Sequence, residues 1–202
     1  MNLDLSWADL VVPSDKRSGR PGSADTWAML LEADAADFVN AVTKLEREPV
    51  EGGAHVATVD GARCETKQNL FAEFADKLNF PGYFGGNWDA FEECISDLVV
   101  IDGIGGHGIG SEFGLGNGIS ASLLMLAISR AELLLLGGSH EDRQILVSIL
   151  RRAASGGNLT EITGPRRLAD LRVIFQSDST GFPSLDRRLA DAGLRGSLRR
   201  TE

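Results

Sequence analysis

The stretch that decides the fold is PGYFGGNWDAFEECI, which spans residues 81–95. Asn87 is expected to cap a helix that begins directly after it, because its side chain can accept a hydrogen bond from a free backbone N–H. Asp89 then lies in the first turn, where the helix dipole favours a carboxylate. At 100° per residue Asp89, Glu92 and Glu93 share one face of this helix. The opposite face is apolar and consists of Phe91, Cys94, Ile95 and Leu98.

The turn before this helix places aromatic side chains beside the acidic face. Tyr83 is the only tyrosine of the chain, and Phe84 follows it. Gly85 is expected to permit a turn that a side chain would strain. Two interpretations are open: the acids are ordinary helix stabilisers beside core aromatics, or they form a surface that docks on a cationic partner.

Strand-like and helical segments alternate on both sides of this stretch. The strand candidates are Trp27–Leu31, His55–Val59, Leu123–Ile128 and Leu171–Phe175. Between them, apolar residues at helical spacing predict helices over residues 38–45, 66–78 and 139–153, with Thr66 as an N-cap and Ser139 with Asp142 as a capping box. The alternation predicts an α/β fold with a mostly parallel sheet and helices packed on it.

The same pattern divides the chain into four segments. The divisions are a flexible segment at residues 1–26, an accessory strand–helix unit at 27–50, a central domain at 51–176 and a polar tail at 177–202 that holds a short helix near residues 185–189. Residues 103–118 contain eight glycines and are expected to form an inserted loop within the central domain.

The 202 residues are 43% hydrophobic and 24% charged, which is typical of a globular protein. The net charge of −9 disfavours direct binding of nucleic acid and favours a basic protein partner. Lys and Arg are missing from residues 78–129, although six acids lie there: Asp89, Glu92, Glu93, Asp97, Asp102 and Glu112. A solvated acidic face that aids solubility remains an alternative explanation.

Two cysteines, an acid-bearing N-terminus and apolar runs interrupted by polar residues predict a cytoplasmic protein without a secretory signal or a membrane span. Residues 103–108 match the GxGxxG pattern of dinucleotide-binding proteins, but the glycines continue through Gly118 and leave no room for the required helix. Asp102, His107 and Glu112 are evenly spaced in this loop, yet scattered polar residues there are expected to be solvated. We therefore expect no catalysis, no metal and no cofactor.

Residues 83–91, YFGGNWDAF, resemble the signature Y-[YF]-G-x-N-x-D-A-[LF] of the barstar family of intracellular ribonuclease inhibitors. The resemblance extends from about residue 55 to residue 175. It implies a barstar-like fold, in which a three-stranded parallel sheet is packed with helices. The accessory unit at residues 27–50 is then expected to add a fourth strand.

The resemblance also implies that the signature helix and the loop before it fill the basic active site of a small ribonuclease. The residues expected to bind this partner are Tyr83, Phe84, Gly85, Asn87, Trp88, Asp89, Glu92 and Glu93. Glu93 stands where barstar has an aspartate, Glu92 replaces an interface tryptophan, and Arg152 occupies the place of an interface acid. These departures suggest a partner other than barnase.

The sequence thus predicts a barstar-like inhibitor of a ribonuclease or related toxin nuclease, with an immunity or antitoxin role. An acidic regulatory module for a basic non-nuclease protein is the second hypothesis. A nucleotide-binding enzyme is the third, and it depends on the glycine pattern at residues 103–108 alone. The target and the oligomeric state are not determined by the sequence.

Overall fold

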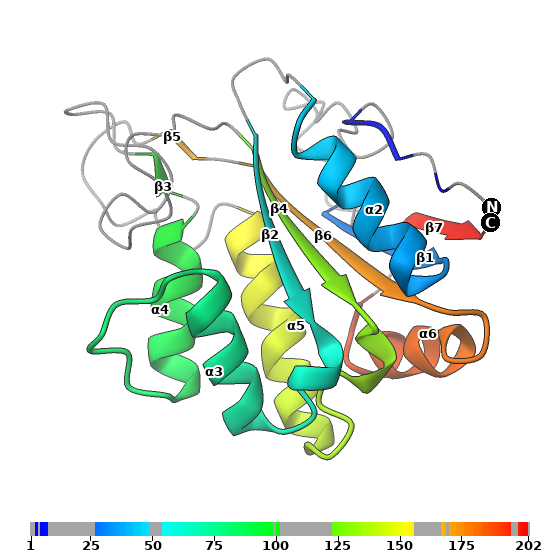
Figure 1. Cartoon of the computed structure of the whole chain (residues 1–202). Coiled ribbons are helices and arrows are strands. Elements are labelled where there is room, and N and C mark those ends of the chain that lie inside the picture. Colours follow the sequence, from blue (N-terminus) through cyan, green and yellow to red (C-terminus); the bar gives the residue numbers. More distant parts are fainter. Residues whose placement is uncertain are drawn as a thin grey trace, which may run out of the picture.

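The computed structural model describes residues 3, 5–7, 27–48, 54–98, 100–101, 123–155, 167–168, 170–194 and 198–201. Their centre is a sheet of five parallel strands in the order β2-β4-β6-β1-β7 (Figure 1). The strands are β1 (Ala28–Glu32), β2 (Ala54–Asp60), β4 (Leu123–Ser129), β6 (Asp170–Ser177) and β7 (Leu198–Thr201). The α/β class, the parallel sheet and the added strand from the unit at 27–50 are confirmed, since β1 pairs with β6.

In the part of the chain that the structure describes, five α-helices cover the two faces of this sheet. They are α2 (Ala35–Leu45), α3 (Lys67–Lys77), α4 (Trp88–Leu98), α5 (His140–Ala154) and α6 (Phe182–Asp191). The chain runs from β1 to the far edge at β2 and then returns in the opposite direction through β4 and β6 to β7. Because parallel crossovers are right-handed, α2 must lie on one face and the later helices on the other, as Figure 1 shows.

Side chains that alternate along the strands pack into two hydrophobic cores, one on each face of the sheet. In β4, Leu124, Leu126 and Ile128 pack on the side of α3, α4, α5 and α6. The residues between them, Leu123, Met125 and Ala127, pack on the side of α2. All seven β4 residues are buried, which explains why the strand is an unbroken apolar run rather than an alternating one.

The described residues of the two end segments, 1–26 and 177–202, include buried apolar side chains. Leu3, Leu5 and Trp7 are buried in the core beside α2, and the Trp7 Nε1 donates to the Leu45 carbonyl at 3.1 Å. At the other end, α6 buries Leu185 and Leu189, and β7 forms a fifth strand beside β1. Because both segments are mostly polar, the sequence pattern gave little indication of these buried apolar residues.

Smaller elements complete the described chain. The apolar residues after α4 do not all continue the helix, because β3 (Val100–Ile101) pairs antiparallel with β5 (Arg167–Leu168). The short 3-10 helices η1 (Gly61–Arg63) and η2 (Ala131–Leu133) follow β2 and β4. The glycine-rich loop at residues 103–118 lies outside the described residues. Within the described part of the chain, no helix has the length and apolar character needed to cross a membrane.

Candidate functional site

The helix α4 begins where the sequence predicts. The Asn87 side-chain oxygen accepts a hydrogen bond from the Ala90 N–H at 2.9 Å, which satisfies a donor of the first turn. The residue whose backbone requires glycine is Gly86, with φ of +61°, rather than Gly85. At Gly85 a side chain would instead approach the Asn87 amide nitrogen, because an added Cβ would lie 3.1 Å from it.

An aromatic cluster holds α4 and its approach loop on α3. Trp88 and Phe71 pack edge to face with ring centroids 4.9 Å apart, and Phe84 contacts Phe71 at 5.9 Å. Phe91 is fully buried, and its ring centroid lies 5.6 Å from that of Phe71. Phe84 and Trp88, which we expected at the partner interface, are therefore half-buried by the protein itself. They position the surface whether or not a partner contacts their exposed edges.

Asp142 connects three of the elements around this surface. Its carboxylate accepts hydrogen bonds from the Trp88 Nε1 at 3.0 Å and from the Ser139 backbone N–H at 3.1 Å, and it lies 3.8 Å from the Lys67 ammonium. The predicted capping box of Ser139 and Asp142 is present. Burial raises the pKa of Asp142, but hydrogen bonds from Ser139 and Trp88 outweigh it and hold the pKa below its ordinary value. This contact fixes the N-terminus of α4 to that of α5.

The three acids of α4, which we call the acidic ridge (Asp89, Glu92 and Glu93), differ in their surroundings. Asp89 and Glu93 are exposed, and neither forms an ion pair with another residue that the structure describes. Glu92 accepts a hydrogen bond from the Arg152 guanidinium of α5, with Oε2 and Nη2 2.8 Å apart. Two carboxylates are therefore available to a partner, and the third is paired within the chain.

The sequence interpretation missed this pair. Glu92 and Arg152 are 60 residues apart, and only the packing of α4 beside α5 brings them together. The one signal that pointed to it was the expectation that Arg152 occupies the place of an interface acid in the resemblance to the barstar family.

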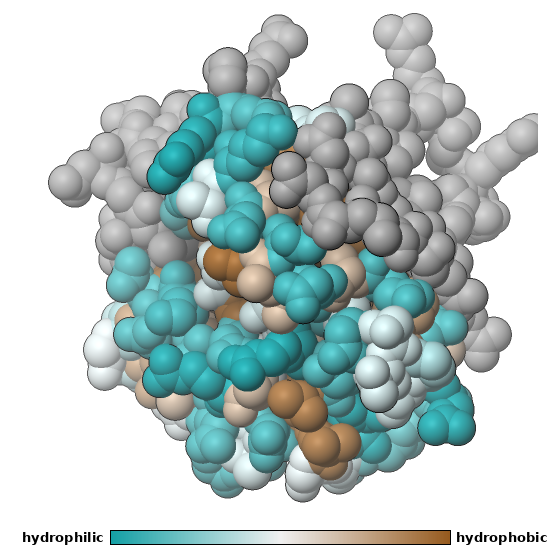
Figure 2. Space-filling view, turned by 45° about the vertical axis from the view of Figure 1, so that its right-hand side comes forward, coloured by the Kyte–Doolittle hydropathy of each residue, from teal (hydrophilic) through white to brown (hydrophobic). Residues whose placement is uncertain are grey.

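Tyr83 projects from the loop before α4, and 81% of its surface is exposed. The other large hydrophobic residues that are exposed in the described chain, Val39 and Leu136, lie on α2 and after η2. Figure 2 shows another face of the molecule, on which hydrophilic residues predominate and hydrophobic ones form small separate areas. An exposed aromatic ring on the loop that leads into a helix with unpaired carboxylates is a feature of interfaces, where tyrosine is enriched.

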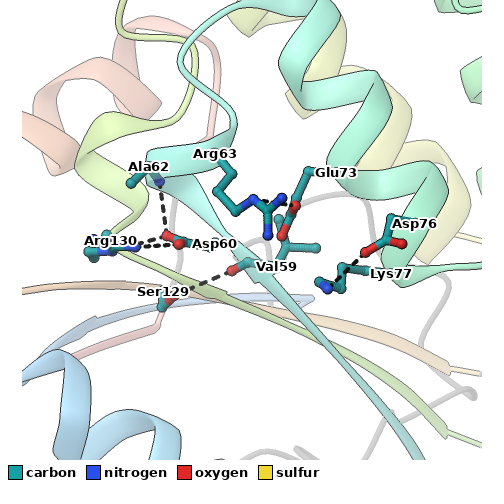
Figure 3. A network of polar contacts seen from close by, with 9 residues as sticks. All are labelled: Val59, Asp60, Ala62, Arg63, Glu73, Asp76, Lys77, Ser129 and Arg130. Atoms are coloured by element: carbon teal, nitrogen blue, oxygen red, sulfur yellow. Dashed lines mark hydrogen bonds and ion pairs between the residues drawn. The ribbon is translucent and has the colours of Figure 1, made fainter.

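A second group of charged side chains lies near the ends of β2 and β4 (Figure 3). We call it the strand-end cluster, and it consists of Asp60, Arg63, Glu73 and Arg130. Both carboxylate oxygens of Asp60 bind the Arg130 guanidinium, with Nε and Oδ1 3.0 Å apart. The Arg63 Nε lies 3.1 Å from the buried Glu73 carboxylate. At Gly61 a Cβ would strike the Arg130 carbonyl, so only glycine allows the two strand ends to approach this closely.

The two cysteine thiols of the chain, Cys64 and Cys94, are both buried. Burial, together with the nearby carboxylates of Glu73 and Asp60, raises the pKa of the Cys64 thiol to about 12. Burial likewise raises the pKa of Cys94 to about 11. Both thiols are thus protonated near neutral pH and inert. Within the described residues no three His, Cys, Asp or Glu side chains gather as a metal site, and the loop with Asp102, His107 and Glu112 lies outside them.

Comparison with protein families gives a match of residues 54–108 to the family described as Barstar (barnase inhibitor). The matched interval contains β2, α3, the loop with Tyr83 and the whole acidic ridge. Comparison with curated protein sequences gives no match.

Among solved structures, the chain is similar to the ORC2 protein of Aeropyrum pernix, whose structure is described as ADPNP-ADP complexes. The TM-score is 0.50 at 10% sequence identity, and the likeness covers 89% of this chain and 42% of the ORC2 chain. At this identity the likeness concerns the fold alone, and this chain spans less than half of that structure's length.

Proposed function

We propose that this protein, whose residues 54–108 match the family described as Barstar, inhibits a basic ribonuclease or a related toxin nuclease. The acidic ridge and the loop with Tyr83 enter the active site of the nuclease and exclude its substrate. The protein acts by binding and performs no catalysis. It protects the RNA of the cell that produces it, which places its action in the cytoplasm.

One observation carries this proposal: Asp89 and Glu93 stand unpaired on a helix that is rigidly held by the rest of the fold. Trp88, Phe91 and Asn87 fix the start of α4 through packing and hydrogen bonds. A surface that is already ordered loses little conformational freedom when it binds, so more of its interaction energy appears as affinity. Unpaired carboxylates on such a surface suit a cationic cleft.

The charge distribution supports the same partner. With a net charge of −9 the protein attracts basic proteins from a distance, and this accelerates association. Direct binding to RNA would bring phosphates against the acidic ridge. Blocking a nuclease by occupying its phosphate-binding side chains therefore fits the charges better than binding nucleic acid.

The nucleotide-binding alternative has one argument in its favour, because the ORC2 structure of similar fold is described with ADPNP and ADP. In this chain the turn from β1 to α2 contains Asp34, whose carboxylate accepts the N–H groups of Ala36 and Asp37 at 2.8 and 3.3 Å. These are the helix N-terminal donors that a phosphate would use. A phosphate there would meet a carboxylate instead.

Side-chain hydrogen bonds of Gln176 on β6 connect the strand ends at this edge of the sheet. Gln176 is fully buried, donates to the Ala33 carbonyl at 2.6 Å and accepts from the Arg130 N–H at 2.9 Å. In open α/β sheets, ligands bind where neighbouring strands lead to opposite faces, and β1 and β6 meet at this point. Both contacts favour a binding protein over a nucleotide-dependent enzyme.

A ribonuclease inhibition assay tests the proposal. The purified protein is added to a set of basic ribonucleases that includes barnase, and the rate of RNA cleavage is measured. Inhibition of at least one nuclease is expected, and Asp89→Ala should weaken it by about thirtyfold, since a central charge contact contributes roughly 2 kcal/mol. Asp191→Ala is the matched control, because it removes an exposed aspartate from α6.

Equal inhibition by the protein and its Asp89→Ala variant would show that another surface contacts the nuclease. If no ribonuclease of the set is inhibited or bound, the inhibitor function is wrong. Specific binding of a basic protein without nuclease activity through Asp89 would then favour the regulatory module.

A further inference from the structure

The ion pair between α4 and α5 changes the electrostatic character of the acidic ridge. Glu92 Oε2 and Arg152 Nη2 are 2.8 Å apart, and 25% and 47% of the two side chains are exposed. The pair thus lies at the surface, beside the unpaired carboxylates Asp89 and Glu93. A protein that covers the ridge must also cover the guanidinium group.

The Arg152 guanidinium can form more hydrogen bonds than the one that it donates to Glu92. Arg carries five N–H donors in a planar arrangement that suits two parallel hydrogen bonds to a carboxylate. One hydrogen bond of Arg152, to Glu92, is observed. The remaining N–H groups on the exposed side of the guanidinium can donate hydrogen bonds to a second carboxylate from outside the chain.

From this geometry we propose that Arg152 determines which nuclease the ridge accepts, by binding an acidic side chain at the edge of the nuclease's basic cleft. The inference rests on the proposed inhibitor function. The partner surface therefore has mixed charge: basic groups opposite Asp89 and Glu93, and a carboxylate opposite Arg152.

A uniformly basic partner is disfavoured for two reasons. The charge of Glu92 is already neutralised by Arg152, so it offers little attraction to an incoming cation. In addition, a cation opposite this pair would approach the guanidinium, and like charges placed together at an interface lower affinity strongly. The pair thereby selects against basic proteins that match Asp89 and Glu93 alone.

The test uses the ribonuclease set with barnase and compares Arg152→Ala with Arg187→Ala. Arg187 is exposed on α6, so its replacement removes the same charge away from the ridge. For any nuclease that the unmodified protein inhibits, Arg152→Ala should raise the dissociation constant at least tenfold, and Arg187→Ala should leave it within twofold. Thermal melting of both variants shows whether the fold is retained.

A charge exchange then identifies the acid on the nuclease. Each exposed Asp and Glu near its active-site cleft is changed to Ala, and one change should cost affinity with the unmodified inhibitor but not with Arg152→Ala. Replacing that acid with Arg should abolish binding of the nuclease to the unmodified inhibitor. The Arg152→Glu inhibitor should bind this nuclease variant with a dissociation constant at least tenfold lower than the unmodified inhibitor does. Arg152→Glu should also gain affinity for nucleases of the set that the unmodified protein rejects.

Two results overturn the inference while leaving the inhibitor function in place. In the first, Asp89→Ala weakens binding but Arg152→Ala and Arg187→Ala behave alike. In the second, Arg152→Ala tightens binding to the nuclease that the protein normally inhibits, which would show that a basic group faces Arg152. If Asp89→Ala also has no effect, the proposed docking surface itself is wrong.

Discussion

The strand-end cluster and the acidic ridge both contain several charged side chains, but they use them differently. In the strand-end cluster, Asp60 binds Arg130 and Glu73 binds Arg63, so each of these acids has a basic partner. On the acidic ridge, Asp89 and Glu93 have no such partner among the described residues. Charges that are paired within the fold stabilise it, whereas those left unpaired on a rigid helix are available for binding.

The acids of the strand-end cluster and of the acidic ridge also differ in how far they are buried. Only 3% of the Glu73 side chain is exposed, so its charge requires Arg63 nearby. Asp89 and Glu93 are solvated, and the unbound protein needs no partner for them. Glu92 is intermediate, because Arg152 neutralises it at the surface. Substitutions in the two regions should therefore separate stability from binding.

The largest effect on stability is expected for Asp60→Ala. The change removes both contacts to Arg130 and the hydrogen bond from the Ala62 N–H at 3.0 Å. A partly exposed ion pair contributes up to about 1 kcal/mol and a capping hydrogen bond about 1 kcal/mol. Urea denaturation should show a free energy of unfolding lower by about 2 kcal/mol. An unchanged unfolding midpoint would contradict the structural role assigned to this cluster.

A smaller, pH-dependent effect is expected for Asp142→Asn. The pKa of Asp142 in the folded protein lies below its ordinary value of 3.8, so ionisation of this group stabilises the fold above that pH. The variant should be less stable than the parent by about 1 kcal/mol at pH 7, since its capping box is weakened. The difference should shrink as the pH falls through the folded-state pKa.

Denaturation curves at pH 7, 4 and 3 measure this trend. Glu141→Gln is the control, because Glu141 is an exposed acid in the same helical turn and has no contact with Trp88 among those described. A difference between Asp142→Asn and the parent that is constant with pH would show that the ionised carboxylate is not the stabilising form.

The smallest stability effect concerns the start of the ridge helix. Asn87→Ala removes the side-chain acceptor of the Ala90 N–H and should lower the free energy of unfolding by at most about 1 kcal/mol. Nuclease binding should weaken indirectly, because a frayed first turn holds Asp89 less firmly. A melting temperature equal to that of the parent would mean that this cap does not stabilise α4.

Much of the fold could be predicted from short-range patterns in the sequence. Unbroken apolar runs such as Leu123–Ile128 indicated buried parallel strands, and they form the centre of the sheet. Polar residues at helix starts, Thr66 and Asn87 among them, accept the backbone hydrogen bonds expected of caps. These signals depend on neighbours within a few residues, which the sequence displays directly.

Contacts between distant segments could not be predicted in this way. Trp7 packs beside Leu45, Asp60 pairs with Arg130 and Glu92 with Arg152, and nothing in the local sequence fixes these partners. The inward packing of Phe84 and Trp88 was one of two interpretations left open, since a loop aromatic can face either solvent or a neighbouring helix. The sequence thus placed the three acids of the candidate site on one helix, whereas the pairing of Glu92 is known only from the structure.

The most direct test of the central claim is the dissociation constant of the Asp89→Ala/Glu93→Ala variant with the nuclease that the protein inhibits, measured together with its free energy of unfolding. We expect binding weakened by at least a hundredfold and stability within about 0.5 kcal/mol of the parent, because exposed unpaired charges contribute little to folding. Unchanged affinity would contradict the claim that the acidic ridge is the docking surface. Loss of stability equal to the loss of binding would contradict the separation of paired and unpaired charges.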